Sequence, residues 1–342
     1  FDPAPMPVEA EIALRPSRVS IPASLQAYCT DDRYERLYHS YGRSVHDLAR
    51  MIHRRDFSNP PDIVAFPRNE TEVADLLDWC GSNGYAAVPF GGGSSVTGGV
   101  NHTRDERYKG LVTIDLCRMD KVLEVDKVSQ AARIQAGVLG PDMERQLAPT
   151  GLTMRFFLQA WEFSSLGGWI ATRAAGHYAT AYTQIDDHIE NLCVVTPAGR
   201  IESRRLPVSG AGPNPDRLML GSEGALGIIT QAWVRLHKKP RFRSATTVRF
   251  TRYDKAVEAV RVISQSGLNP ASARLLERDE ALFTEAGDGR HDVLVLNFES
   301  GDHPLQPWMD RALEICADHG GEWDADTMTD EDANRKGAAG NW

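Results

Sequence analysis

The chain has 342 residues, of which 42% are hydrophobic and 25% are charged, and its formal net charge is -9. This length allows roughly two domains, and the acidic balance argues against nucleic acid as the main partner, because phosphate binding requires a basic surface. The five cysteines are widely scattered, without a C-x-x-C pair. We therefore expect buried thiols rather than disulfides or a zinc site, and no bound metal.

The first part of the chain predicts an arm that precedes an alternation of strands and helices. Residues 1–57 form this arm, with a helix over 32–54, where apolar side chains recur at helical spacing. A short strand is expected over 63–66. Asn69 and Glu72 then form a capping box that opens a helix, and Asn83-Gly84 ends it. The next strand, over 86–90, leads into a glycine-rich loop.

The middle of the chain continues this alternation. The expected elements are strands over 111–116 and 131–136, a helix over 141–147, a hairpin of strands 192–196 and 200–202, and a strand over 228–236. After Lys238-Lys239-Pro240 the pattern changes, which indicates a domain boundary at residue 240. The predicted domains are thus an N-terminal helical arm (1–57), a central domain (58–240) and a partial α+β domain (241–342).

The partial domain is expected to contain strands over 245–250, 272–276 and 293–298. Two helices should cover one face of this antiparallel sheet. The side chains that these helices should bury are Ala256, Val257, Val260 and Ile263 in the first, and Trp308, Ala312, Ile315 and Cys316 in the second.

The run PFGGGSSVTGG, from Pro89 to Gly99, is the most informative stretch. Glycines let the backbone approach a ligand closely, and successive N–H groups can then form an anion-binding loop. A flexible turn is the alternative. A second segment, GSEGALGIIT (221–230), repeats this chemistry and again leads into a strand. Neither loop matches a Walker loop or a Rossmann fingerprint, so the pattern favours a diphosphate cofactor that is held by loops.

Four ordered motifs, PFGGGSSVTGG, QAWEFSSLGGWIATRAAG (159–176), GSEGALGIIT and PASARLL (270–276), resemble those of the flavin-dependent alkyldihydroxyacetonephosphate synthases and their bacterial relatives. These belong to the FAD-binding fold of vanillyl-alcohol-oxidase type. The resemblance implies an α+β protein in which two subdomains bind FAD, followed by an incomplete α+β cap domain. It also implies that FAD is bound noncovalently, because no His, the residue that often carries a covalent flavin, lies between Pro89 and Gly99.

The resemblance carries over to individual residues. The implied FAD-binding positions are Pro89, Phe90, Gly91, Gly92, Gly93, Ser94, Ser95, Gln159, Ala160, Trp161, Glu162, Phe163, Ser164, Ser165, Thr172, Arg173, Ala174, Ala175, Glu223, Gly224, Ala225, Leu226, Gly227, Ile228 and Ile229. A branched side chain at Gly92 is expected to occupy space that the diphosphate needs. Gln159 departs from the family, since mammalian synthases have an acid there.

Arg274 matches an arginine that matters for activity in the family, and we predict a catalytic role for it; the alternative is a strand-end ion pair. His177, Tyr178, Tyr182 and His188 crowd one segment and either fix a loop or border the active site. The family's acid/base tyrosine and histidine-rich loop would follow Trp342, so we expect this chain to be part of a longer protein.

The activity that the resemblance implies is the exchange of the acyl group of acyl-dihydroxyacetone phosphate for a fatty alcohol, a step of ether-lipid synthesis. The alternatives are an FAD-linked oxidoreductase of a small 2-hydroxy acid, such as lactate or glycolate, and an inactive flavin-binding protein. We expect a lipid-like or small 2-oxo/2-hydroxy substrate, peripheral membrane contact and a homodimer. The expected location is the bacterial cytoplasm, at the membrane surface, or the peroxisome in a eukaryote.

Overall fold

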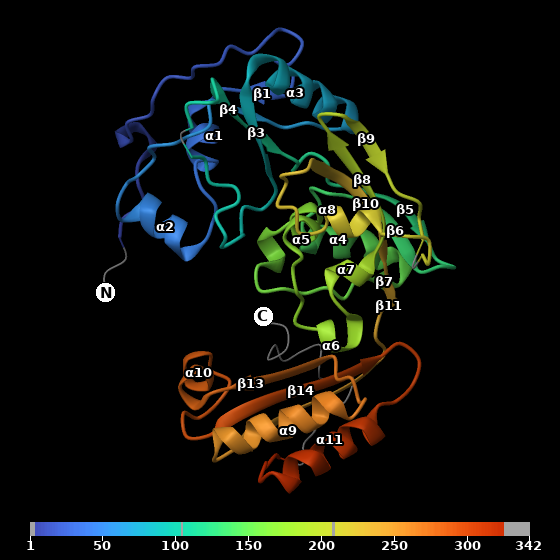
Figure 1. Ribbon diagram of the computed structural model, residues 1–342. Helices are drawn as coiled ribbons and strands as arrows, with labels where there is room; N and C mark the ends of the chain where they lie inside the picture. The colour runs from blue at the N-terminus through green and yellow to red at the C-terminus, as the bar shows by residue number, and fades with distance from the viewer. Residues whose placement is uncertain (1–3, 104, 207–208, 325–342) are drawn as a thin grey trace. The chain divides into compact units, whose positions relative to one another are not determined.

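The computed structural model describes residues 4–103, 105–206 and 209–324, which divide into two compact units (Figure 1). The first unit comprises Phe1–Thr150, Ala160–Ala174 and Ile185–Leu236. The second unit comprises Gly151–Gln159, Ala175–Gln184 and His237–Trp342. The chain therefore makes two short excursions into the second unit, Gly151–Gln159 and Ala175–Gln184, before it enters that unit for the last time at His237. Within the described ranges, no helix has the length and apolar character needed to cross a membrane.

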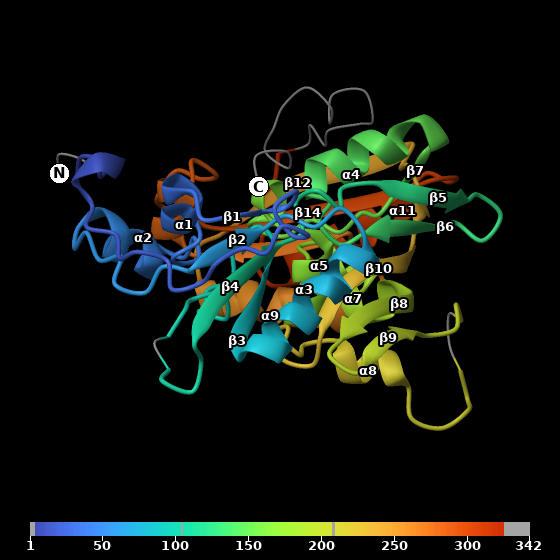
Figure 2. The same ribbon diagram turned by 90° about the horizontal axis from the view of Figure 1, so that it is seen from above.

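The first sheet of the first unit has the strand order β1-β2-β4-β3, with β2, β4 and β3 parallel and β1 antiparallel at the edge (Figure 2). These strands are β1 (Cys29–Thr30), β2 (Ile63–Ala65), β3 (Tyr85–Phe90) and β4 (Gly110–Asp115). Every residue of β2 and β4 is buried, which is typical of the central strands of a parallel sheet. The carboxyl ends of β3 and β4 therefore lie next to each other.

Helix α3 (Glu70–Asn83) connects β2 to β3 and begins as the sequence predicts. The side chain of Asn69 accepts a hydrogen bond from the N–H of Glu72 at 2.9 Å, and Gly84 ends the helix at a φ of +69°. Only this half of the capping box is formed. The carboxylate of Glu72 instead accepts from the N–H of Arg68 at 2.7 Å and from its guanidinium.

The N-terminal arm contains the turn η1 (Glu9–Glu11) and two helices, α1 (Arg33–Tyr38) and α2 (Val45–Ile52), where the periodicity predicts one. The helix is interrupted because the intervening backbone bonds to distant loops. The N–H of Gly42 donates to the side chain of Asn101 at 2.8 Å, and the N–H of Arg43 donates to the carbonyl of Gly93 at 2.7 Å. Tertiary hydrogen bonds here replace helical ones.

The second sheet of the first unit is antiparallel, with the order β5-β6-β10-β8-β9. Its strands are β5 (Val122–Asp126), β6 (Ala131–Gln135), β8 (Ile189–Thr196), β9 (Gly199–Glu202) and β10 (Ile228–Arg235). The expected hairpin is thus β8–β9, whereas β5 lacks a clear sequence signal. The accompanying helices and turns are α4 (Gly140–Leu147), η2 (Ala148–Thr150), η3 (Trp161–Phe163), α5 (Leu166–Thr172), α7 (Ile185–His188) and α8 (Pro215–Met219).

The second unit is built on an antiparallel sheet with the order β12-β14-β13, and helices α9 and α11 cover one of its faces (Figure 1). Its elements are β7 (Leu152–Thr153), α6 (Ala179–Tyr182), β11 (His237–Lys238), β12 (Phe242–Phe250), α9 (Tyr253–Gln265), β13 (Ser272–Leu276), α10 (Arg278–Phe283), β14 (Asp292–Ser300) and α11 (Gln306–Asp318).

Two of the expected core positions of the second unit are wrong. Val257 and Trp308 are partly exposed, at 43% and 38%, because the helices turn their Ala259 and Met309 sides toward the sheet instead.

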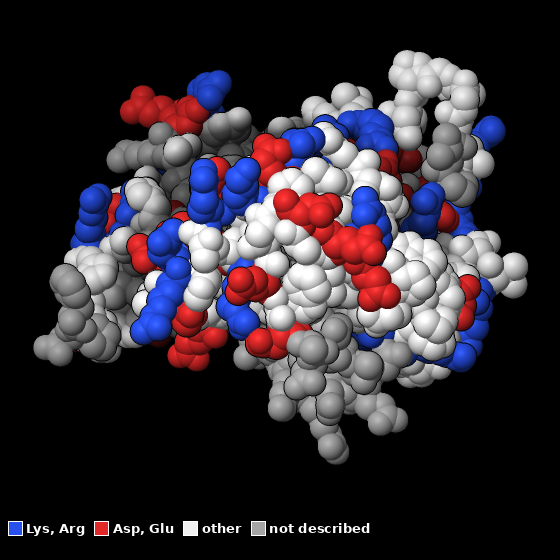
Figure 3. Space-filling model, turned by 90° about the horizontal axis from the view of Figure 1, so that it is seen from below, with Lys and Arg blue, Asp and Glu red and all other residues white. Residues whose placement is uncertain are grey.

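Figure 3 shows acidic and basic side chains interspersed on one face of the molecule. On α9 and α11 such charges form pairs one helical turn apart, Arg261 with Glu258 and Arg311 with Glu314.

A buried ion pair ties both excursions of the chain to β14. Arg155 donates to Glu299 through Nε at 2.7 Å and through Nη2 at 2.6 Å, and the side chain of Glu299 is only 1% exposed. The guanidinium also lies over the rings of Phe157, Tyr178 and Tyr182, at 4.8 to 5.8 Å. Tyr178 and Tyr182 thus surround a structural ion pair, which agrees with a loop-fixing role.

Candidate cofactor site

The glycine-rich loop begins where β3 ends, at the carboxyl edge of the parallel sheet. None of the backbone N–H groups of Gly91–Ser95 donates a hydrogen bond to another described residue. Gly93 has a φ of +66°, and a Cβ on it would lie 2.6 Å from the ring of Phe90, so the turn requires glycine. A loop whose N–H groups donate to no described residue, and which contains a left-handed glycine, can bind an anion such as a diphosphate.

Gly91 and Gly92 lie against the segment Phe163–Ser165. A Cβ on Gly91 would overlap the hydroxyl of Ser165. A Cβ on Gly92 would overlap the carbonyl oxygen of Phe163 and lie 2.8 Å from Cα of Ser164. The atoms that exclude a side chain at Gly92 therefore belong to the protein's own backbone, whereas the expectation from the sequence is that the diphosphate needs this space. The absence of side chains lets two predicted cofactor segments contact each other.

The second glycine segment also lies beside the first. Gly224, with a φ of +80°, would place a Cβ on the ring of Pro89, and a Cβ on Gly99 would lie 3.0 Å from Oε2 of Glu223. The N–H of Glu223 donates to the carbonyl of Ala171 at 2.9 Å, at the end of α5. The three stretches predicted to hold the cofactor, around residues 89–95, 160–174 and 221–227, are thus brought together in the first unit.

Several predicted cofactor residues make structural contacts within this arrangement. Ser164 accepts from the indole N–H of Trp169 at 2.7 Å, and Ser165 caps α5 through the N–H of Gly168. Arg173 ends α5 in a left-handed conformation, with a φ of +51°. Its guanidinium forms an ion pair with Asp186.

Other predicted cofactor residues lie within helix α5, in strand β10 or in the second unit. Thr172 donates to the carbonyl of Gly168 within α5, and Ile228 and Ile229 are buried in β10. Gln159 and Ala175 belong to the second unit. Their roles at the cofactor stay predictions.

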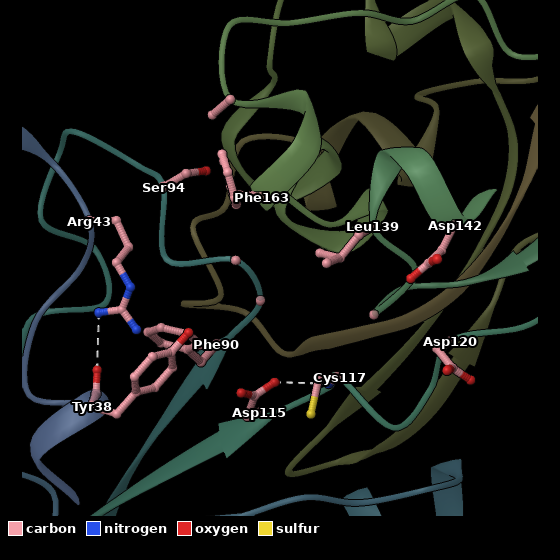
Figure 4. A pocket seen from close by; sticks show the side chains of 14 residues that line it. Tyr38, Arg43, Phe90, Ser94, Asp115, Cys117, Asp120, Leu139, Asp142 and Phe163 are labelled. Atoms are coloured by element: carbon pink, nitrogen blue, oxygen red, sulfur yellow. Dashed lines mark hydrogen bonds between the residues drawn. The ribbon is translucent and has the colours of Figure 1, made fainter. Parts of the chain in front are cut away.

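The first unit contains a cleft of about 530 Å³ beside the glycine loop (Figure 4). This volume is in the range of ligand and cofactor pockets. Predicted residues that line it are Phe90, Gly91, Gly92, Ser94, Ala160 and Phe163. The other lining residues, which are not predicted as cofactor-binding from the sequence, are Tyr38, Arg43, Asp115, Cys117, Asp120, Gly137, Leu139 and Asp142.

One of these unpredicted residues, Asp115, ends β4 next to the end of β3. It accepts from Nε2 of His39 and from the N–H of Cys117, at 2.9 and 2.8 Å. The rule that ligands lie at the carboxyl ends of parallel strands could have identified Asp115 from the sequence.

Cys117 is exposed, so the expectation of buried thiols is wrong at this position and correct for the other four cysteines. Desolvation nevertheless raises the pKa of Cys117 to about 12, which keeps the thiol protonated.

The predicted catalytic residue, Arg274, lies on β13 in the second unit. Its Nη2 forms an ion pair with Glu280 at 3.2 Å, as in the expected alternative, although Arg274 lies in the middle of the strand and not at its end. Desolvation lowers the pKa of His177, and the charge of Arg274 lowers it further, so these two side chains interact electrostatically. A catalytic role for Arg274 stays a prediction.

Within the described ranges, no group of three or more His, Cys, Asp or Glu residues could hold a metal ion.

Comparison with known proteins agrees with this geometry. Residues 61–204 match the family model described as "FAD binding domain". The chain is 36% identical over 250 residues to the alkyldihydroxyacetonephosphate synthase of Dictyostelium discoideum, a match that covers 73% of this chain and 40% of the relative. It is 33% identical over 222 residues to the mitochondrial D-lactate dehydrogenase (cytochrome) 1 of Saccharomyces cerevisiae, covering 64% and 37%.

A solved structure of an alkyldihydroxyacetonephosphate synthase superposes with a TM-score of 0.85 at 29% identity, and covers 93% of this chain and 63% of that one. The fold and the cleft thus define an FAD-binding protein of vanillyl-alcohol-oxidase type, with FAD as its cofactor. The chain is similar over 73% of its length to alkyldihydroxyacetonephosphate synthases, and its FAD-binding domain and its relatives indicate an FAD-dependent enzyme. It spans about two fifths of the length of the curated synthases that it matches.

Proposed function

We propose that this chain belongs to an FAD-dependent transferase that exchanges the acyl group of acyl-dihydroxyacetone phosphate for a long-chain alcohol. The products are the alkyl ether and a fatty acid, with no net oxidation or reduction. The observation that carries this proposal is the 36% identity to the synthase of Dictyostelium discoideum over 250 residues. When bound, FAD supplies the covalent catalysis of such an exchange.

The residues of this chain support the proposal through cofactor binding. The undonated N–H groups of Gly91–Ser95 would bind the diphosphate, and the packing of Gly92 on Phe163 holds that loop against the segment that leads into α5. The noncovalent mode of binding, the cytoplasmic location near a membrane surface and the homodimer stay predictions. A lipid-like substrate is the physical reason to expect membrane contact.

The second candidate is an FAD-linked dehydrogenase of a small 2-hydroxy acid. It is supported by the 33% identity to the yeast D-lactate dehydrogenase. The two candidates differ in electron flow, because a dehydrogenase must pass two electrons from its substrate to an acceptor whereas the exchange retains none.

Anaerobic mixing of the FAD-loaded protein separates the candidates. We expect acyl-dihydroxyacetone phosphate to bleach the flavin absorbance without reducing an added acceptor dye, and D-lactate to leave the absorbance unchanged. Bleaching by D-lactate with reduction of the dye would overturn the transferase proposal in favour of the dehydrogenase. No bleaching by either substrate would favour the inactive flavin-binding alternative.

A further inference from the structure

We propose that Arg43 binds a phosphate of FAD and supplies the positive charge that the glycine loop lacks. This inference rests on FAD as the cofactor and not on the reaction proposed above. Arg43 lies in the turn between α1 and α2, which the sequence predicts as continuous helix. It lines the cleft together with Gly91, Gly92 and Ser94.

The main chain of Arg43 fixes its position relative to the loop. Its N–H donates to the carbonyl of Gly93 at 2.7 Å, directly within the run Gly91–Ser95. The two segments also pack closely here, since a Cβ on Gly42 would lie 2.8 Å from the same carbonyl. Because this contact belongs to the backbone, a substitution of the Arg43 side chain leaves it in place.

The guanidinium of Arg43 is held over the ring of Tyr38, 3.9 Å from the centroid. Nη1 donates to the carbonyl of Tyr38 at 3.1 Å, while Nη2 is buried and has no hydrogen-bond partner among the described residues. A buried charged donor without a partner is unfavourable, so a ligand that accepts from Nη2 would remove this cost. Figure 4 shows the guanidinium beside Tyr38, on the side of the cleft that carries Ser94.

The charges around the cleft show why an anion needs this residue. Among the described residues that line the cleft, Arg43 is the one base, and the acids are Asp115, Asp120 and Asp142. The chain as a whole has a net charge of -9. A diphosphate carries two negative charges, which the neutral N–H groups of the loop only partly balance. An arginine fork, which donates two hydrogen bonds to phosphate oxygens, provides the missing cation.

The test compares binding of FAD with binding of riboflavin, which has the same ring system and no phosphate. Flavin-free protein is titrated with each ligand while the quenching of flavin fluorescence is followed, at low and high salt. We expect Arg43→Gln to weaken FAD binding by about ten- to hundredfold, the loss of a charge-assisted hydrogen bond, and to leave riboflavin binding unchanged. The affinity of the variant should also depend less on salt.

Two further variants serve as controls. Arg50 also stacks on a tyrosine, 4.5 Å from the ring of Tyr41, but it is paired with Asp56 and does not line the cleft. Arg50→Gln should therefore keep the FAD affinity within about twofold of the wild type. Arg43→Lys retains the charge and should recover part of the affinity, and it also tests the proposal if Arg43→Gln does not fold.

The outcomes distinguish Arg43 from the cofactor assignment. FAD affinity within twofold of the wild type in Arg43→Gln, or equal losses for FAD and riboflavin, would overturn the proposal. A loss of affinity for dihydroxyacetone phosphate in the FAD-loaded variant, with FAD binding unchanged, would assign Arg43 to a substrate phosphate and also overturn it. Failure of the wild-type protein to bind FAD would overturn the cofactor itself.

Discussion

Gly92→Ala tests whether the close contact between the glycine loop and Phe163–Ser165 is required for FAD binding. The added Cβ would overlap the carbonyl oxygen of Phe163, and it would lie 2.7 Å from the carbonyl carbon of Phe163 and 2.8 Å from Cα of Ser164. Comfortable carbon–carbon contacts are about 3.5–4.0 Å, so the two backbones must separate by at least about 1 Å. Such overpacking costs about 1–3 kcal/mol of unfolding free energy.

The same displacement moves the N–H groups of Gly91–Ser95 away from the diphosphate. Loss of one hydrogen bond to a charged group costs about 1.5–3 kcal/mol, which is roughly a ten- to hundredfold rise in the Kd for FAD. The assay is the fluorescence titration described above, with a thermal melt of the FAD-free protein. Gly92→Ala should lower both the FAD affinity and the melting temperature.

Gly81→Ala is the matched control. Gly81 lies in α3, and a Cβ on it would meet no atom within 4 Å. Alanine is favoured over glycine inside a helix by about 1 kcal/mol, so this variant should melt no lower than the wild type and bind FAD equally well. If Gly92→Ala instead behaved like Gly81→Ala in both measurements, the contact with Phe163 would not be what requires glycine at residue 92.

Three further predictions concern buried ionisable side chains. Glu299→Gln leaves Arg155 buried without its counter-ion and should lower the free energy of unfolding by about 3–5 kcal/mol in denaturant unfolding. The control Glu258→Gln, on the surface, should change the free energy of unfolding by less than about 1 kcal/mol. Equal losses of stability in the two variants would contradict a buried pair. Burial lowers the pKa of His102 from 6.5 to about 4, so the unfolded chain binds the proton more readily than the folded protein. The free energy of unfolding should therefore fall as the pH drops from 6.5 toward 4. His102→Asn should reduce this dependence of the melting temperature on pH. Burial alone would raise the pKa of Asp62, but hydrogen bonds from Arg18, Arg15 and backbone N–H groups lower it. The contribution of Asp62 to stability is therefore present above the ordinary carboxyl pKa and is lost only in strong acid. Asp62→Asn should lower the free energy of unfolding by roughly 3–5 kcal/mol at neutral pH, and an unchanged stability would argue against these hydrogen bonds.

Much of the fold was predictable because its signals are local. The glycine run after 86–90 and the cap at Asn69 each follow from a few neighbouring residues, and both are present as β3 and α3. The strands of the second unit were also predictable, since β12, β13 and β14 alternate buried and polar positions or form apolar runs. Strand β5 was missed because none of its residues is buried and its apolar residues, Val122, Leu123 and Val125, do not alternate regularly with polar ones.

The cofactor segments were identified from motifs, yet their contacts were not. The sequence indicates glycine at residue 92 and leaves open whether a ligand or the chain itself requires it. The fold places Phe163 there, and it brings Arg43 to the loop from a stretch that reads as helix. Both facts depend on backbone groups that meet across about 70 and 50 residues, a distance over which local periodicity carries no information.

The sequence by itself determined that one glycine loop follows a strand and that a second leads into a strand, and that both loops suit a diphosphate, because strand pattern and glycine content act within a few residues. Only the tertiary structure decided which cation faces the first loop, and that Arg155 and Glu299 join the two excursions of the chain to β14. Ion pairs and close backbone contacts depend on positions in space. Residues distant in the chain acquire those positions only when the sheets have formed.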